Sequence, residues 1–180
     1  MTSTPSISSL SESATDKGTA HQQVEATPRT LLRWRPLPAP VTEAASAAAL
    51  LETHDSPVPC RRCQHDSRAG DAMLLLSYDP FLGSSPYRGA SPIYLHPRCQ
   101  SVGAEDVGQL LLDRQRARLL SVRAFDGRHM MVDADVVDGG VLLETCGRML
   151  ALGKPAEYCY VHKTMHGCFA VRVERGGRAD

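Results

Sequence analysis

Runs of apolar residues along the chain predict several short strands. The continuous apolar stretch within Asp71–Tyr78 predicts a buried strand, and the shorter run Ile93–Leu95 predicts a second one. Ser121–Phe125 and Met130–Val136 flank an Asp126-Gly127 pair, which is typical of the turn of a β-hairpin. The middle of the chain is therefore expected to contain antiparallel strand pairs.

The chain closes on a second predicted hairpin. Glu157–His162 and Cys168–Glu174 are rich in strand-forming residues and are joined by a short turn. Simple alternation places Phe169, Val171 and Val173 on one face of the last strand. We expect that face to be buried.

Three segments have helical patterns. Thr42 is a suitable cap for a helix over Thr42–Thr53, and Ala104–Leu119 carries an apolar face with arginines near its end. A third segment has apolar residues at i, i+4, i+7 and i+8, namely Leu142, Cys146, Met149 and Leu150. Strands and helices follow one another without a βαβ order, so the sequence predicts an α+β fold with a mixed or antiparallel sheet, two to three helices and a C-terminal β-hairpin.

The composition changes sharply near residue 30. Residues 1–30 are rich in Ser, Thr, Gln and Glu without hydrophobic periodicity, which predicts a disordered tail. Residues 31–177 contain all the predicted elements and are long enough for one compact domain. The last three residues, 178–180, are expected to fray.

The charge balance excludes several classes of partner. Acidic and basic residues number 20 each, so no overall field favours nucleic acid or an anionic membrane. No apolar run approaches the roughly 20 residues that span a bilayer, and the N-terminus lacks the order of a secretory signal. A cytoplasmic location follows, where the six cysteines are expected to be thiols or metal ligands.

Two short motifs carry the strongest chemical signal. Cys60 and Cys63 form a C-x-x-C motif, and His96 and Cys99 form an H-x-x-C motif about thirty residues later. Three thiolates and one imidazole make the closed tetrahedral shell that Zn²⁺ prefers in structural sites. His65 is an alternative fourth ligand. Unrelated thiols and a redox C-x-x-C remain open as other interpretations, although redox motifs usually begin a helix and Cys63 is followed by a turn-like sequence.

A second group of reactive residues surrounds the last predicted turn. Cys168 is a candidate nucleophile, and His162 or His166 is its candidate base. The competing interpretation is an ordinary hairpin in which Cys168 packs as a small residue. No Asn or Asp is placed by the sequence to orient either histidine.

The segment Asp79–Pro92 is a long connection punctuated by Gly and Pro, and long loops within compact domains are often functional. We expect any ligand groove to lie between this loop and the final hairpin. Its candidate lining residues are Tyr78, Tyr87, Arg98 and His162.

Several phrases of the sequence occur together in a known bacterial family. They are Cys60-Arg61-Arg62-Cys63, Leu74–Phe81, Ser85–Tyr87, Ser91–His96 with Cys99, and Gly167–Phe169 with Arg172. Over Trp34–Arg175 the chain resembles domain of unknown function 1203. The resemblance implies a single domain in which the Cys60, Cys63, His96, Cys99 and Cys168 positions belong to shared motifs. It implies no particular reaction.

The sequence therefore predicts a cytoplasmic, zinc-stabilised binding module with no assignable reaction, whose partner is a protein or a small molecule. The alternative is a thiol-dependent enzyme or redox sensor centred on Cys168. Neither membrane nor nucleic acid is expected as a partner.

Overall fold

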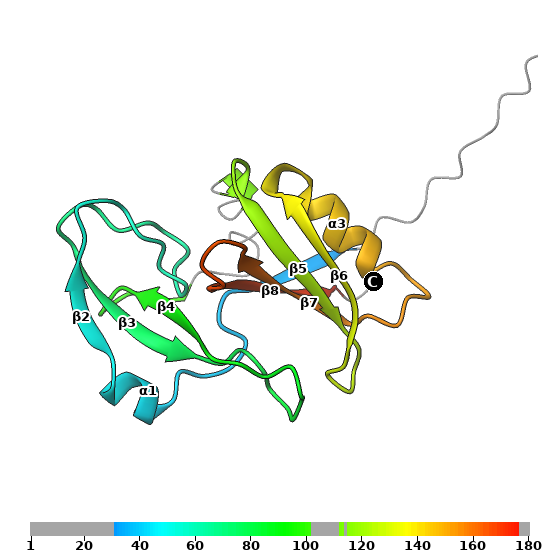
Figure 1. The fold of residues 1–180 in the computed structure, drawn as a ribbon, viewed down its shortest axis with the longest axis horizontal. Helices are drawn as coiled ribbons and strands as arrows, with labels where there is room; N and C mark the ends of the chain where they lie inside the picture. The colour runs from blue at the N-terminus through cyan, green and yellow to red at the C-terminus, as the bar shows by residue number, and fades with distance from the viewer. Residues whose placement is uncertain (1–30, 102–111, 114, 177–180) are drawn as a thin grey trace, which may run out of the picture.

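The computed structural model describes residues 31–101, 112–113 and 115–176. The tail predicted over residues 1–30, most of the helix predicted over Ala104–Leu119 and the frayed end at 178–180 lie outside the described residues. Within the described part, two antiparallel sheets and two helices form a small α+β domain that ends in a hairpin, as predicted (Figure 1).

The larger sheet has five strands in the order β1-β8-β7-β5-β6, all antiparallel. Its members are β1 (Leu32–Arg35), β5 (Leu119–Phe125), β6 (Met131–Asp138), β7 (Tyr158–Lys163) and β8 (Phe169–Arg175). The predicted β5–β6 and β7–β8 hairpins are both confirmed. The first strand of the described chain therefore pairs with the last one.

The smaller sheet has three strands in the order β2-β3-β4, also antiparallel. It consists of β2 (Leu50–Thr53), β3 (Ala72–Tyr78) and β4 (Ser91–Leu95). The two sheets stand beside one another in Figure 1, with the helix α3 (Leu142–Met149) over the larger one. A 3₁₀ turn, Gly139–Val141, leads into α3.

Two cores lie on opposite faces of the five-stranded sheet. On the α3 side, the four periodic residues predicted for this helix pack against β5, β7 and β8. On the other face, the aromatic core brings rings of the larger sheet against the small sheet; its members include Phe81, Phe125, Tyr158, Tyr160, Phe169, Met73 and Ile93. The strand β7 is buried on both faces, which explains why its first four residues, Tyr158–Val161, are all non-charged and buried.

The helix predicted over Thr42–Thr53 is only half right. Thr42 caps α1 (Glu43–Ala47) through its Oγ1, which accepts a hydrogen bond from the Ala45 N–H at 3.1 Å. The second half is a strand instead, because Leu50–Thr53 pairs along β3. No residue of α1 is buried, so no buried packing favours a longer helix. Leu50–Thr53 instead forms backbone hydrogen bonds with β3, which stabilise it as a strand.

The prediction of one apolar face on the last strand is wrong at Phe169. A β-bulge shifts the β7–β8 register, so that Val161 pairs with Val171 but His162 pairs with Phe169. The extra residue turns Phe169 into the aromatic core, while Val171 and Val173 stay on the α3 side. Alternation in the sequence carries no sign of this bulge.

Among the residues that the structure describes, no helix is both long and apolar enough to cross a membrane.

Candidate metal centre

The first candidate metal-binding motif lies on a tight turn outside the small sheet. Pro59 and Asp66 form an isolated antiparallel bridge, and the Cys60 N–H donates to the His65 carbonyl at 3.0 Å. The Gln64 N–H donates back to the Cys60 carbonyl at 3.0 Å, and Gln64 adopts a left-handed φ of 59°. Because the turn reverses the chain between Cys60 and Gln64, the side chains of Cys60 and Cys63 lie on the same side of it.

The second motif follows β4 directly. Cys60 forms a parallel bridge with Tyr94, and the Arg61 N–H donates to the Tyr94 carbonyl at 2.9 Å. The end of β4 is thus fastened beside the first turn before the chain reaches His96. Backbone pairing between the Cys60 turn and the end of β4 therefore positions the two motifs relative to each other.

The four predicted ligands converge. The Sγ atoms of Cys60, Cys63 and Cys99 and a ring nitrogen of His96 all lie within 4.8 Å of one another. Cys60 Sγ and Cys99 Sγ are 3.5 Å apart, and Cys63 Sγ lies 3.3 Å from His96 Nδ1. Tetrahedral coordination with Zn–S near 2.3 Å separates ligand atoms by about 3.6–3.8 Å. The observed spacing fits such a shell with only small adjustments.

The backbone adds polar contacts around these ligands. The His96 N–H donates to Cys60 Sγ at 3.3 Å, and Cys99 Sγ lies 3.6 Å from the His96 carbonyl oxygen. An N–H group directed at sulfur stabilises a thiolate and is common around structural metal sites. His65 is exposed and is not part of the cluster, so the described geometry favours His96 as the fourth ligand.

The charges of the site favour a cation. Burial raises the pKa of Cys60, but hydrogen bonds from the backbone of Cys63, His96 and Arg62 outweigh it and hold the pKa below its ordinary value. Burial, together with the neighbouring Cys60 and Cys99 charges, raises the pKa of Cys63 to about 12. Burial and Cys60 likewise raise the pKa of Cys99. Three thiolates so close together repel one another, and a bound divalent cation removes that repulsion.

The donor set also restricts which metal fits. Three thiolates with one imidazole are soft ligands, which suit Zn²⁺ and disfavour Mg²⁺ or Ca²⁺. Cys60 is fully buried and the other three residues are partly buried. Four protein donors complete a tetrahedron, so the residues present fit a closed metal site.

The candidate thiol site at the last turn is less well assembled. Cys168 is partly buried, and its Sγ lies 3.7 Å from the His166 carbonyl oxygen. His166 is exposed on the turn. Across residues 31–101, 112–113 and 115–176, no hydrogen bond joins Cys168 Sγ to the ring of His162 or His166. The nucleophile and its candidate bases are neighbours in sequence without the contact that base catalysis uses.

The four groove candidates occupy different places. Tyr78 is buried, and its hydroxyl exchanges hydrogen bonds with the backbone of Ala39 at 2.9 and 3.0 Å. Arg98 is exposed, two residues after His96. Tyr87 and His162 line a common cavity of about 160 Å³ between the Asp79–Pro92 loop and the larger sheet. Tyr78 and Arg98 do not line this cavity.

Three other residues of this cavity have no obvious signal in the sequence. They are Ser91, Arg123 and Tyr160. Arg123 is one of many arginines on predicted strands, and only the pairing of β5 with β7 reveals that it lies beside His162. Side chains alternate between the two faces along a strand, so Arg123 lies on the face opposite Val122. This alternation is the signal in the sequence from which its position could have been inferred.

Comparison with known proteins supports the resemblance. Residues 57–175, which make up 119 of the 180 residues, match the family described as protein of unknown function (DUF1203). The chain belongs to the DUF1203 family. No curated protein and no solved structure matches the chain.

The DUF1203 match covers all four candidate metal ligands as well as Cys168. It begins after β2, so β1 and α1 precede the matched region although β1 completes the larger sheet. The resemblance predicted over Trp34–Arg175 is therefore confirmed from residue 57 onward.

His162 is expected to make this DUF1203 protein less stable in mild acid. Burial lowers the pKa of His162 to about 4 from an ordinary 6.5, with help from the charges of Arg123 and Arg61. Between these two pH values the unfolded chain binds a proton that the folded protein excludes, so stability falls as the pH falls. The His162 ring keeps some solvent exposure, which weakens the effect. We therefore expect His162 to lower the free energy of unfolding by about 1–2 kcal/mol between pH 7 and pH 5.

Urea unfolding of the metal-loaded protein at pH 7 and pH 5 tests this expectation. The His162→Gln variant should lose less stability over this range than the wild type, by about 1–2 kcal/mol. The exposed His166→Gln variant is the control and should follow the wild type. Equal pH dependence of wild type and His162→Gln would contradict the assignment.

Proposed function

We propose that this DUF1203 protein is a zinc-stabilised binding module of the bacterial cytoplasm, in which the metal is structural and no reaction is catalysed at it. The observation that carries the proposal is the convergence of Cys60, Cys63, His96 and Cys99, with ligand atoms all within 4.8 Å. Two independent motifs, one on each side of β3 and β4, supply this shell.

A structural role is supported by the completeness of the donor set. Catalytic zinc usually has three protein ligands and an open position for water or substrate, whereas structural zinc has four protein ligands. Here the fourth donor is His96, whose Nδ1 lies 3.3 Å from Cys63 Sγ. A bound zinc would tie the turn at Cys60 to the end of β4 and close the chain that runs through β3.

The cytoplasmic assignment rests on the cysteines. None of the six forms a disulfide, including Cys146 and Cys159 in the α3-side core. Free thiols together with a thiolate metal site suit a reducing compartment. The binding role is supported by the small cavity beneath the Asp79–Pro92 loop, and the expected partner is a protein or a small molecule.

Elemental analysis of protein purified without a metal-affinity tag tests the proposal. We expect about one zinc per chain, and we expect the Cys60→Ser/Cys63→Ser double variant to lose nearly all of it, because two of four ligands are gone. The Cys168→Ser variant is the matched control and should keep its zinc. A substoichiometric zinc content in the wild type, or full zinc in the double variant, would refute the metal site.

A further inference from the structure

A second site lies under the Asp79–Pro92 loop, apart from the metal ligands. Its volume is about 160 Å³. The residues that give it chemical character are Phe81, Tyr87, Phe125, Tyr160, Arg123 and His162. Sites for drug-sized ligands usually span about 300–1,000 Å³, so this cavity suits a smaller molecule.

Four phenyl or phenol rings, from Phe81, Tyr87, Phe125 and Tyr160, form part of the cavity wall. The ring of Phe81 meets Phe125 and Tyr160 edge-on, with centroids 5.3 and 4.9 Å apart. Tyr87 lies edge-on to Phe125 at 6.0 Å and is 41% exposed, so its ring stands at the mouth. Aromatic walls of this kind favour a flat, apolar ligand body over a branched one.

The polar groups of the cavity are positive or unpartnered. Arg123 is exposed, and within the described part of the chain its guanidinium has no ion pair or hydrogen bond. Its partner across the strands β5 and β7 is Tyr160, and His162 lies two residues further along β7. His162 Nδ1 is shielded from solvent and has no hydrogen-bond partner. A buried polar nitrogen without a partner is uncommon, and this one belongs to a residue of the cavity wall.

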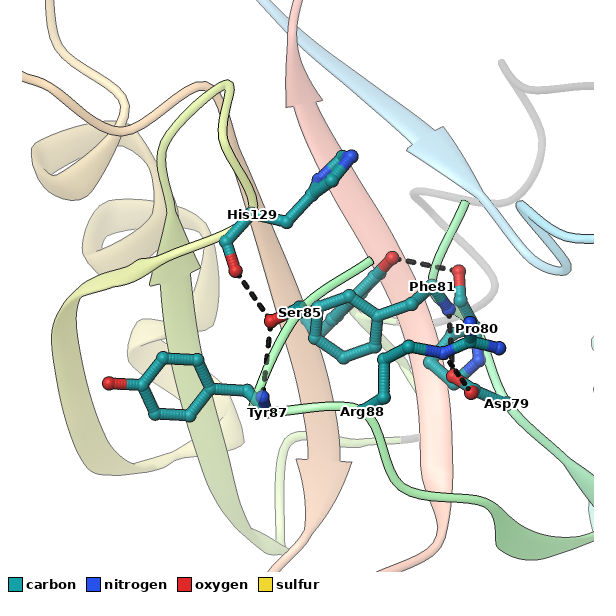
Figure 2. Close-up of polar contacts among 8 residues, drawn as sticks. Asp79, Pro80, Phe81, Ser85, Tyr87, Arg88 and His129 are labelled. Carbon is teal, nitrogen blue, oxygen red and sulfur yellow. Dashed lines mark hydrogen bonds and ion pairs between the residues drawn. The ribbon is translucent and has the colours of Figure 1, made fainter. Parts of the chain in front are cut away.

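Asp79, the residue before Pro80 of the cavity wall, is already paired with a cation. Asp79 Oδ2 accepts from Arg88 Nε at 2.8 Å, and its Oδ1 accepts from the Phe81 N–H at 3.0 Å (Figure 2). The unmatched positive charge of Arg123 is therefore left for a ligand. A guanidinium binds a carboxylate through two parallel hydrogen bonds.

The loop that covers the cavity is fixed in place. Ser85 Oγ donates to the His129 carbonyl at 2.7 Å and accepts from the Tyr87 N–H at 3.1 Å (Figure 2). The Tyr160 hydroxyl donates to the Pro80 carbonyl at 2.8 Å from the sheet side. These bonds hold Phe81 and Tyr87 in position before any ligand arrives, which reduces the entropy lost on binding.

We propose that this cavity binds a small aromatic carboxylate, with the carboxylate on Arg123, on the side of His162, and the ring between Phe81, Tyr87 and Phe125. The proposal deepens the binding part of the proposed function and does not depend on the metal. A neutral ligand would leave Arg123 unpaired, and a branched aliphatic acid would match the aromatic walls poorly.

Benzoate is the probe, titrated into ¹⁵N-labelled, full-length, zinc-loaded protein and followed by amide chemical shifts. We expect shifts at Ser91, His162 and Gly167, with a dissociation constant below about 1 mM. Benzamide has the same shape without the charge and should bind at least about tenfold more weakly.

The Arg123→Gln variant should also weaken benzoate binding by about tenfold or more, because the charge-assisted bonds are lost. The matched control is Arg128→Gln, which removes the same charge from a side chain that is 86% exposed and lies outside the cavity. Equal affinity for benzamide, unchanged binding by Arg123→Gln, or shifts only outside the cavity would each overturn the proposal.

Zinc content measured on the same samples separates the two proposals. Benzoate binding by a protein that lacks zinc would refute the metal site and support the cavity. Zinc-loaded protein that does not bind benzoate would refute the cavity and leave the metal site standing.

Discussion

Removal of the metal is expected to lower the melting temperature by about 10 °C or more. Structural zinc in small peptides has apparent binding free energies of about 10–16 kcal/mol, whereas whole domains are stable by only about 5–15 kcal/mol. A loss of only about 4 kcal/mol in the free energy of unfolding lowers the melting temperature by about 8–16 °C in a domain of this size. The metal is thus expected to contribute a large part of the total stability.

When the metal is removed, the backbone amides of the small sheet should lose their protection from hydrogen exchange before those of the larger sheet. Its strand β4 ends just before the candidate ligand His96, and the Cys60–Tyr94 bridge joins this strand to the Cys60 turn. Thermal melts and hydrogen exchange of chelated protein and of Cys99→Ser measure this effect. Cys168→Ser is the control, since Cys168 is also partly buried but lies outside the ligand cluster. A melting temperature unchanged by chelation would show that the cluster does not stabilise the fold through a metal.

Gly139→Ala is expected to destabilise the protein by about 2–4 kcal/mol. Gly139 is buried where β6 ends and the turn into α3 begins. A Cβ on Gly139 would overlap the backbone carbonyl of Gln115 and lie 3.1 Å from the Arg116 nitrogen. The Gly139 N–H also donates to the Arg118 carbonyl at 2.8 Å, so neither segment can move away freely.

Gly140→Ala provides a matched control one residue away. A Cβ on Gly140 meets no atom within 4 Å, and its effect should stay within about 0.5 kcal/mol. Urea unfolding of the two variants gives the comparison directly. Equal stability of Gly139→Ala and Gly140→Ala would mean that the Gln115 backbone relaxes away from the added methyl group.

The elements that the sequence predicts well are those defined by local patterns. The helix α3 has its apolar residues at helical spacing, and the β5–β6 hairpin has an Asp-Gly turn. The strand β2 was missed because Leu50–Thr53 continues an alanine-rich helical pattern and its exposed leucines have no period-two alternation. Its pairing with β3 joins residues that are 19 (Thr53 and Ala72) to 25 (Leu50 and Leu75) positions apart, and local propensity does not register such distant partners.

The convergence of the candidate metal ligands could be predicted for a similar reason. Each pair is two residues apart, so a single tight turn suffices to bring each pair together, whatever the rest of the fold. The cavity differs, because Arg123 and His162 meet only through the register of β5 with β7. The bulge beside His162 moves Phe169 to the opposite face, and a bulge has no reliable signature in one sequence.

The pairing of β1 with β8 has a consequence for synthesis on the ribosome. The Arg35–Glu174 contact joins residues 139 positions apart, and the Gly176 N–H donates to the Leu31 carbonyl at 2.6 Å. At a translation rate of about 5–20 residues per second, β8 is synthesised about 7–28 s after β1. The Cys60, Cys63, His96 and Cys99 motifs emerge long before then. If the proposed site binds its metal, the nascent chain can therefore bind it and form the small sheet while the larger sheet still lacks the strand β8, which pairs with both β1 and β7.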